Sequence, residues 1–282
     1  MILTVLVGGL GNQMFQYAAG LALAKKKNVP VLAYYPDGGR PLLHETFSLT
    51  AGCATEADFR QYFGSSGLAG RVNRRVQTML PPAARRFYEN NKLNYDPTLF
   101  RLGDNVLLRG YWQSFRYFED LRSILKAEFT PLHRLSAAAE EMRAQIESHN
   151  SIGIHVRRGD YLNAFRVLDA DYYSRAIDGI SESSLHSSQI FVFTNDAVWC
   201  HRHLLPERSK ILVSSPLILA HEDLLLLSAC RNIITANSTF SWWAAYLADA
   251  PASIIAPQGW ICGDSEEFKQ EDIYPETWDI VS

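Results

Sequence analysis

Glycines followed by two amide side chains form the first stretch of this sequence that could contact a ligand. It reads Gly8-Gly9-Leu10-Gly11-Asn12-Gln13 and lies between an apolar run and a helical pattern. A glycine-rich turn between a strand and a helix lets backbone N–H groups approach a phosphate or a sugar closely. We expect Asn12 and Gln13 to reach a ligand from this turn. The alternative is a tight turn in which Asn12 only caps the helix.

This stretch fails two nucleotide-binding patterns. The third glycine of G-x-G-x-x-G would fall on Met14, and no Gly-Lys-Ser or Gly-Lys-Thr follows. These failures disfavour a dinucleotide-dependent oxidoreductase and exclude a P-loop.

A second apolar run is followed by charged side chains. The segment at its end reads His155-Val156-Arg157-Arg158-Gly159-Asp160. The planar fork of an arginine suits a diphosphate. Strand alternation places Arg157 on the face of His155 and turns Arg158 the other way. We expect one arginine to bind the ligand and the other to be held by Asp160 or by backbone. The alternative is a buried Arg–Asp pair that only stabilises the turn.

A third run ends in Asn237-Ser238-Thr239-Phe240, where a helical pattern begins. Hydroxyl groups and unpaired amides at a helix N-terminus form an anion site without a metal. A plain helix cap by Asn237 or Ser238 is the alternative.

Two further places in the sequence carry weaker signals of ligand binding, and two short patterns resemble incomplete metal sites. Asn195 and Asp196 follow another apolar run, and Asp223 opens a helix, where its carboxylate could accept the N1 and N2 protons of guanine. An ordinary helix-start acid is the alternative for Asp223. The C-H-x-H pattern at 200–203 has no second half, and the D-x-D pattern at 169–171 fits a helix cap, so we expect no metal.

The elements that must position these residues alternate between apolar runs and helical patterns. Several runs are apolar at successive residues, which is typical of parallel strands covered on both faces. Alternation of this kind predicts an α/β fold with ligands at the carboxyl ends of the strands. The predicted strands are 2–7, 29–34, 105–109, 152–156, 190–193, 211–213, 233–235 and 253–256, and the predicted helices are 14–27, 117–126, 136–148, 172–180, 222–230 and 239–248.

Two lobes are expected, because 282 residues lie at the upper edge of what one hydrophobic core serves. The hydrophobic pattern lapses near 148–151, which places the lobes at 1–150 and 151–282. We expect 59–96 to be an irregular or helical insertion without a strand. Its arginines are expected on a solvated face, with contact to an acidic surface or an acceptor lipid as the alternative.

Composition narrows the class of protein and its partners. A net charge of −3 excludes a strongly basic nucleic-acid binder. The four cysteines are far apart, which favours a reducing compartment, and the first seven residues fit a strand rather than a signal peptide. We therefore expect a cytoplasmic protein with at most peripheral contact to the inner membrane.

Four motifs in this order resemble the α-1,2-fucosyltransferases of bacteria and animals: G-G-L-G-N-Q-M-F-Q-Y, H-V-R-R-G-D-Y, F-T-N-D and N-S-T-F-S-W-W. The resemblance implies a GT-B fold, with two Rossmann-like lobes and a donor cleft between them. It implies inverting, metal-independent transfer of L-fucose from GDP-β-L-fucose, a co-substrate, to O2 of a terminal β-galactoside. The acceptor would be an oligosaccharide or a lipid-linked glycan in bacterial surface polysaccharide synthesis.

The resemblance also implies roles for the residues of these motifs. Arg157 would clamp the diphosphate, His155 would lie near the ribose or guanine, and Asp223 would read the guanine. Asn12 and Gln13 would face the fucose or the acceptor. The remaining donor-binding candidates are Arg158, Asn195, Asp196, Ser238, Thr239 and Phe240.

The general base is the open part of this interpretation. Arg157, Asn12 and Asp160 are the catalytic candidates, but Asp160 could instead pair with Arg158. Core fucosyltransferases carry a glutamate where this chain has Phe165, so that role does not transfer. Transfer with another linkage and a catalytically silent GDP-sugar- or glycan-binding protein are the alternatives.

Overall fold

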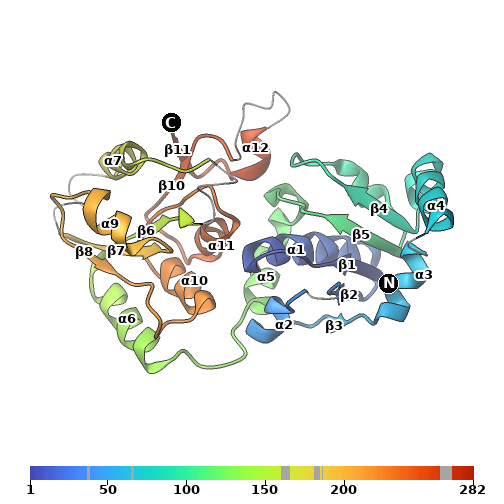
Figure 1. Cartoon of the computed structure of the whole chain (residues 1–282), viewed down its shortest axis with the longest axis horizontal. Coiled ribbons are helices and arrows are strands. Elements are labelled where there is room, and N and C mark those ends of the chain that lie inside the picture. The colour runs from blue at the N-terminus through green and yellow to red at the C-terminus, as the bar shows by residue number, and fades with distance from the viewer. Residues whose placement is uncertain (37–38, 65–66, 160–165, 181–184, 186, 261–268) are drawn as a thin grey trace. The chain divides into compact units, whose positions relative to one another are not determined.

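The computed structural model describes residues 1–36, 39–64, 67–159, 166–180, 185, 187–260 and 269–282. The chain divides into two compact units, Met1–Leu132 and His133–Ser282, and each contains its own parallel sheet (Figure 1).

The first unit contains a parallel sheet with strand order β3-β2-β1-β5-β4. β1 is central, because its Ile2 pairs with Val31 on one side and Val106 on the other. The strands are β1 (Ile2–Val5), β2 (Val31–Tyr34), β3 (Gly52–Cys53), β4 (Phe87–Asn90) and β5 (Val106–Gly110). The helices are α1 (Leu10–Lys27), α2 (Leu42–Thr46), α3 (Glu56–Phe63), α4 (Leu68–Met79) and α5 (Arg122–Glu128), with short 3₁₀ turns η1 (Pro82–Ala84), η2 (Pro97–Arg101), η3 (Phe115–Tyr117) and η4 (Glu119–Leu121).

Glycines let α1 start sharply and pack closely on β1. Gly8 has a φ of +80°, which favours glycine, and it makes the turn between the two elements. A Cβ on Gly20 would lie 2.9 Å from Cβ of Thr4, so only a glycine lets the helix approach the strand this closely. Gly20 therefore brings α1 and the polar residues of its first turn close to the sheet.

The second unit contains a sheet with strand order β8-β7-β6-β9-β10-β11, which is the order of a Rossmann fold. Figure 1 shows α7 and α9 on one face of this sheet and α6, α10 and α11 on the other. The strands are β6 (Asn150–Val156), β7 (Ser188–Thr194), β8 (Lys210–Leu212), β9 (Asn232–Ile234), β10 (Ser253–Pro257) and β11 (Asp279–Val281). The helices are α6 (Ala137–Ser148), α7 (Ala170–Asp178), α9 (Ala197–His203), α10 (Ala220–Ser228), α11 (Thr239–Leu247) and α12 (Gln270–Ile273).

The division between the units precedes the position expected from the hydrophobic pattern. We expected it after residue 150, and it falls after Leu132. Helix α6 belongs to the second unit because it packs against α10 and β6. Its cap residue Ser136 also donates its backbone N–H to the Glu222 carboxylate of α10. The gap in the pattern near 148–151 is therefore only the turn between α6 and β6.

Two expectations for the first unit are wrong. The stretch 59–96 does contain a strand, because β4 pairs with β5 as an edge strand. Its four residues include Glu89 and Asn90, so the strand carries little apolar signal. Helix α1 begins at Leu10 rather than at residue 14, so Asn12 and Gln13 lie in its first turn.

No helix in the described part of the chain is long and apolar enough to cross a membrane. Cys53, Cys200 and Cys230 are free thiols, and Cys262 lies outside the described residues.

Candidate functional site

The switch point of the second sheet lies between β6 and β9, the neighbouring strands from which the chain continues in opposite directions. Two tyrosines of α7 hold this point. Tyr172 donates its hydroxyl to the backbone carbonyl of Thr235 just after β9, at 2.7 Å, and Tyr173 donates to the carbonyl of His155 in β6, at 3.2 Å. Both tyrosines are buried, so they fix the strand ends that carry the predicted ligand residues.

Arg158 is held by the ends of β7 and α9. Its Nε lies 3.4 Å from Oδ2 of Asp196, and its guanidinium lies 4.1 Å from the centre of the Trp199 ring. Its backbone N–H donates to Oδ1 of Asn195 at 2.9 Å. The expected partner Asp160 lies outside the described residues. Among the described residues, Asp196 supplies the negative charge that pairs with Arg158, and the preceding residue, Arg157, is half-buried.

His155 is a buried neutral histidine at the end of β6. Burial and the neighbouring Arg157 guanidinium lower the pKa of His155 to about 3. Its ring lies 5.3 Å from the ring of Phe240 in α11. Its Nδ1 is buried and has no hydrogen-bond partner among the described residues. A buried unpaired nitrogen is costly, and a ligand at this position would satisfy it.

The N-terminus of α11 has no side-chain cap. Ser238 is the buried cap residue, but its side chain accepts no hydrogen bond from the helix. Asn237 instead donates to the carbonyls of Arg166, at 2.9 Å, and Trp260, at 3.4 Å. The first-turn N–H groups are therefore open to an anion. This arrangement does not match the alternative in which Asn237 or Ser238 is a plain cap.

Asp223 in α10 is tied to the end of β7 through Ser214. The Ser214 hydroxyl donates to Oδ2 of Asp223 and accepts the backbone N–H of Thr194 at 3.0 Å. The other oxygen, Oδ1, is buried without a hydrogen-bond partner in the described part of the chain. Burial raises the pKa of Asp223 to about 6, although the Ser214 hydrogen bond opposes this shift.

Glu222, not Asp223, accepts the backbone hydrogen bond at the start of α10. Its carboxylate accepts the backbone N–H of Leu219 at 2.8 Å and also binds Ser136 of α6. The role of an ordinary helix-start acid therefore belongs to Glu222, whereas Oδ1 of Asp223 has no hydrogen-bond partner among the described residues.

In the first unit, Asn12 and Gln113 meet at the carboxyl ends of β1 and β5. The amide of Gln113 donates to Oδ1 of Asn12 at 3.0 Å. Gln113 follows Trp112, which has an unusual φ of 54° and is buried. Nδ2 of Asn12 has no hydrogen-bond partner among the described residues and is oriented by this contact. We did not predict Gln113, because its only sequence signal is its place after a strand.

Gln13 is buried, and its side-chain amide forms hydrogen bonds within the first unit. It donates to the carbonyls of Gly8, at 3.0 Å, and Arg40, at 2.9 Å, and it accepts the N–H of Leu43 at 3.3 Å. These bonds join the glycine turn to the start of α2. Gln13 thus positions the turn in which Asn12 lies.

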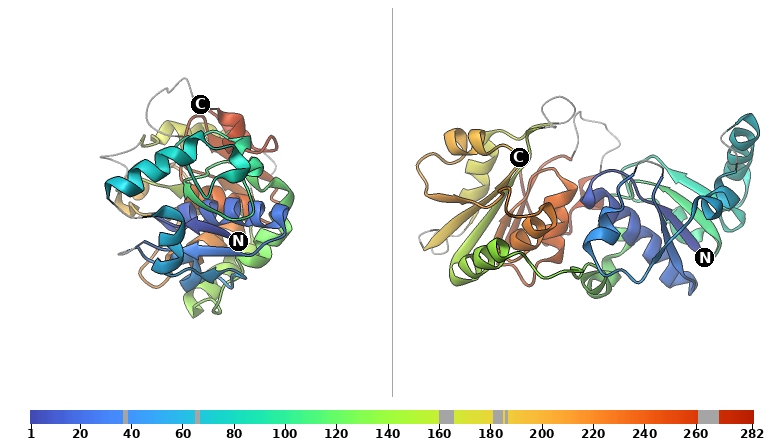
Figure 2. Two further views of the ribbon diagram at one scale, coloured as in Figure 1. Left: turned by 90° about the vertical axis from the view of Figure 1, so that its right-hand side faces the viewer. Right: turned by 60° about the horizontal axis from the view of Figure 1, so that its bottom comes forward.

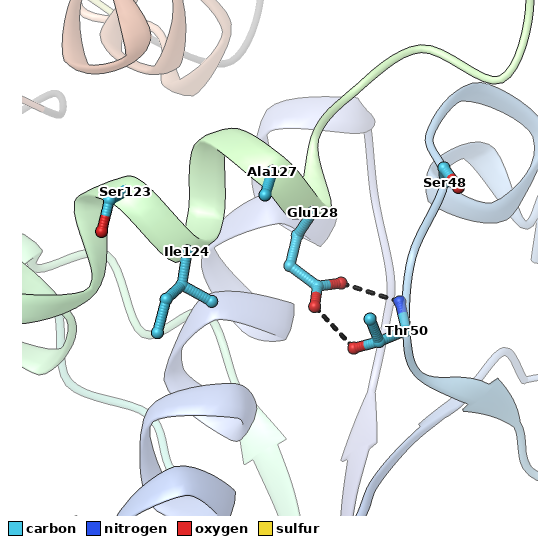
Figure 3. A pocket seen from close by; sticks show the side chains of 6 residues that line it. All are labelled: Ser48, Thr50, Ser123, Ile124, Ala127 and Glu128. Atoms are coloured by element: carbon cyan, nitrogen blue, oxygen red, sulfur yellow. Dashed lines mark hydrogen bonds between the residues drawn. The ribbon is translucent and has the colours of Figure 1, made fainter.

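A hollow of about 310 Å³ lies elsewhere in the first unit (Figure 3). Its buried carboxylate, Glu128, accepts the N–H and the hydroxyl of Thr50, at 2.9 and 2.5 Å, and the Tyr17 hydroxyl at 2.7 Å. These bonds join α5, α1 and the loop before β3, so the carboxylate has a structural role. The lining residues, none of which belongs to the four motifs, are Ser48, Thr50, Ser123, Ile124, Ala127 and Glu128.

The two weak metal patterns have no support in the described residues. No group of three or more His, Cys, Asp and Glu side chains there could hold a metal. Asp169 caps α7 by accepting the N–H of Tyr172 at 2.9 Å, as expected.

Known proteins with similar sequences are glycosyltransferases. Escherichia coli alpha-1,2-colitosyltransferase is 29% identical over 97% of this chain and 96% of its own length. Galactoside alpha-(1,2)-fucosyltransferase 2 of Pongo pygmaeus is 27% identical over 89% of this chain and 70% of its own length.

The fold is similar to that of a solved plant enzyme. A mutant of Arabidopsis thaliana FUT1 in complex with GDP superposes with a TM-score of 0.53, covering 90% of this chain and 69% of the plant chain at 13% identity. The two parallel sheets and this likeness confirm the GT-B fold class with two Rossmann-like lobes.

A sequence profile of glycosyl transferase family 11 matches residues 89–282. This match covers more than half of the chain, including the ends of β6, β7 and β9, and the chain therefore belongs to glycosyl transferase family 11.

Proposed function

We propose that this glycosyltransferase moves L-fucose from GDP-β-L-fucose to O2 of a terminal β-galactoside, with inversion and without a metal. The observation that carries the proposal is the group of unsatisfied polar atoms around the switch point of the second sheet. Nδ1 of His155 and Oδ1 of Asp223 have no hydrogen-bond partner among the described residues, and the N-terminus of α11 has no side-chain cap. Family membership and the name of the Pongo pygmaeus relative support the same reaction.

The donor is assigned to the second unit. Arg157 binds the diphosphate, and the first turn of α11, with Ser238 and Thr239, binds the β-phosphate. His155 and Phe240 lie against the ribose or the base, and Asp223 accepts the N1 and N2 protons of guanine. Arg158, Asn195 and Asp196 are positioning residues, because they hold one another and the loop that carries Arg157.

Transfer of the sugar requires stabilisation of the negative charge that develops on GDP as it leaves. The bond from C1 of fucose to the β-phosphate oxygen breaks, a bond from C1 to the acceptor oxygen forms on the opposite face, and the acceptor hydroxyl loses its proton. A preorganised arginine and helix-terminal amides stabilise the negative charge on GDP without a metal. Asp160 is the candidate for the group that takes the proton; without it, an oxocarbenium-like step with weak base assistance remains.

The acceptor side is assigned to the first unit. Asn12, oriented by Gln113, contacts the fucose or the galactoside through its amide, while Gln13 holds the turn through its hydrogen bond to the Gly8 carbonyl. We place the reaction in the cytoplasm, in the synthesis of a bacterial surface polysaccharide on an oligosaccharide or lipid-linked acceptor.

Colitosyl transfer is the second candidate, favoured by the 29% identity to the Escherichia coli enzyme over nearly the whole chain. Colitose is L-fucose without its 3-hydroxyl group. The two donors therefore share the GDP moiety and differ only in the sugar, so the residues assigned above would bind either nucleotide.

Reaction products distinguish these possibilities. The chain is incubated with GDP-fucose or GDP-colitose and with type 1 and type 2 galactosides, and the product linkage is determined by NMR. We expect an α-1,2-linked fucosyl product that forms equally well in excess EDTA. A product with another linkage, or a preference for GDP-colitose, would contradict the proposed reaction. GDP binding without any turnover would indicate a catalytically silent binding protein. A strict metal requirement would refute the metal-free step.

Replacing Arg157 with Lys tests the diphosphate assignment. Lysine keeps the charge but lacks the planar fork, so GDP binding measured by calorimetry should weaken by about tenfold or more, since a charge-assisted hydrogen bond contributes roughly 1.5–3 kcal/mol. Arg157→Ala should abolish transfer. Arg202→Lys, at an exposed position in α9, is the matched control and should change neither quantity. Full transfer activity in Arg157→Ala would exclude the assignment.

The pH dependence of GDP binding tests Asp223. Only the ionised carboxylate accepts both guanine protons, and its pKa is raised to about 6. Affinity should therefore fall as the pH drops through this value, approaching about tenfold per pH unit. Asp223→Asn should bind GDP more weakly at pH 8 and show a shallower profile. Because GDP phosphate titration is common to both proteins, parallel profiles would rule out a role for Asp223.

A further inference from the structure

Helix α4 in the first unit packs with its polar side inward and exposes its apolar side. We infer that this helix is a docking surface for an anionic lipid bilayer. Figures 1 and 2 show α4 at the surface of the first unit, beside β4, the edge strand of its sheet. The inference is independent of the reaction proposed above.

The side of α4 that faces the protein is polar. The guanidinium of Arg74 lies 4.0 Å from the centre of the Phe63 ring and donates to the carbonyl of Phe63 at 3.1 Å. Oε1 of Gln77 accepts the backbone N–H of Arg86 at 2.8 Å. The small, buried Gly70 lies on the same side. These contacts fix the rotation of the helix about its axis.

The opposite side is an exposed apolar stripe. Leu68 is 71% exposed, Val72 55%, Val76 45% and Met79 83%. Their spacing of three and four residues puts them on one face of the helix. An amphipathic helix normally buries this face, and contiguous exposed apolar residues mark interaction surfaces.

Two arginines without partners flank the stripe. Arg71 and Arg75 are exposed and make no ion pair or side-chain hydrogen bond within the described residues. The wider stretch 59–88 contains six arginines and no Asp, Glu or Lys, although the whole chain has a net charge of −3. Arg71 and Arg75 therefore place two unpaired positive charges beside the apolar stripe of α4.

Apolar residues flanked by arginines match a bilayer with anionic headgroups. Such a helix lies in the plane of the interface with its apolar side among the acyl chains and its cations at the lipid phosphates. At twelve residues, α4 is about 18 Å long and cannot cross the hydrocarbon core. Packing of two copies through this stripe would bring their unpaired arginines together, which disfavours self-association.

Sedimentation with vesicles tests the inference. The whole chain is mixed with vesicles of phosphatidylcholine alone or with added phosphatidylglycerol. We expect binding to the anionic vesicles only, weakened by salt. Arg71→Gln with Arg75→Gln should lower the affinity roughly 25-fold, since each arginine near the surface contributes about fivefold. Val72→Ser with Met79→Ser should also weaken binding, and all four positions are exposed, so thermal stability should not change.

A control variant on α9 tests whether the vesicle binding is specific to α4. Val198→Ser with Arg202→Gln changes an exposed valine and an exposed arginine of α9 and should leave vesicle binding unchanged. Absence of binding to anionic vesicles would overturn the inference. So would binding that survives both α4 double substitutions, or self-association in analytical ultracentrifugation that depends on Val72 and Met79, since the stripe would then be an interface between copies.

Discussion

The proposed donor site of this glycosyltransferase rests on polar groups that the second unit buries but does not pair. Nδ1 of His155 and Oδ1 of Asp223 would each lower stability, since an unpaired buried group costs about 1–3 kcal/mol, and the start of α11 has no side-chain cap. The apolar core formed by β6 and its neighbours must offset this cost. The tyrosines of α7 bind the backbone at the ends of β6 and β9, which fixes the position of the backbone that carries His155.

Adjacent polar residues have different partners in three of the four motifs and at the start of α10. Gln13, Arg158, Glu222 and Asn237 bind protein groups, and the neighbour of each one is the residue assigned to a ligand: Asn12, Arg157, Asp223 and Ser238. The bound member sets the backbone from which its neighbour is presented.

The central strands and the motif positions could be predicted from the sequence, because parallel strands covered on both faces read as continuous apolar runs. The edge strands β3 and β4 could not be predicted, because β3 has two residues and β4 carries Glu89 and Asn90. The contacts that orient the site join residues far apart in the chain, such as Gln113 with Asn12 and Glu222 with Ser136. No local pattern encodes these pairs, so Gln113, Ser214 and the shift of α6 into the second unit emerged only from the structure.

Replacement of His155 with Phe measures most directly whether the unpaired groups are kept for a ligand. Phenylalanine retains the packing against Phe240 and removes the unpaired nitrogen. The account predicts that urea unfolding shows equal or greater stability, by up to about 1–3 kcal/mol, while calorimetry shows at least about tenfold weaker GDP binding, the equivalent of one hydrogen bond. Unchanged GDP affinity in the substituted protein would contradict the account, because His155 would then be a core residue only.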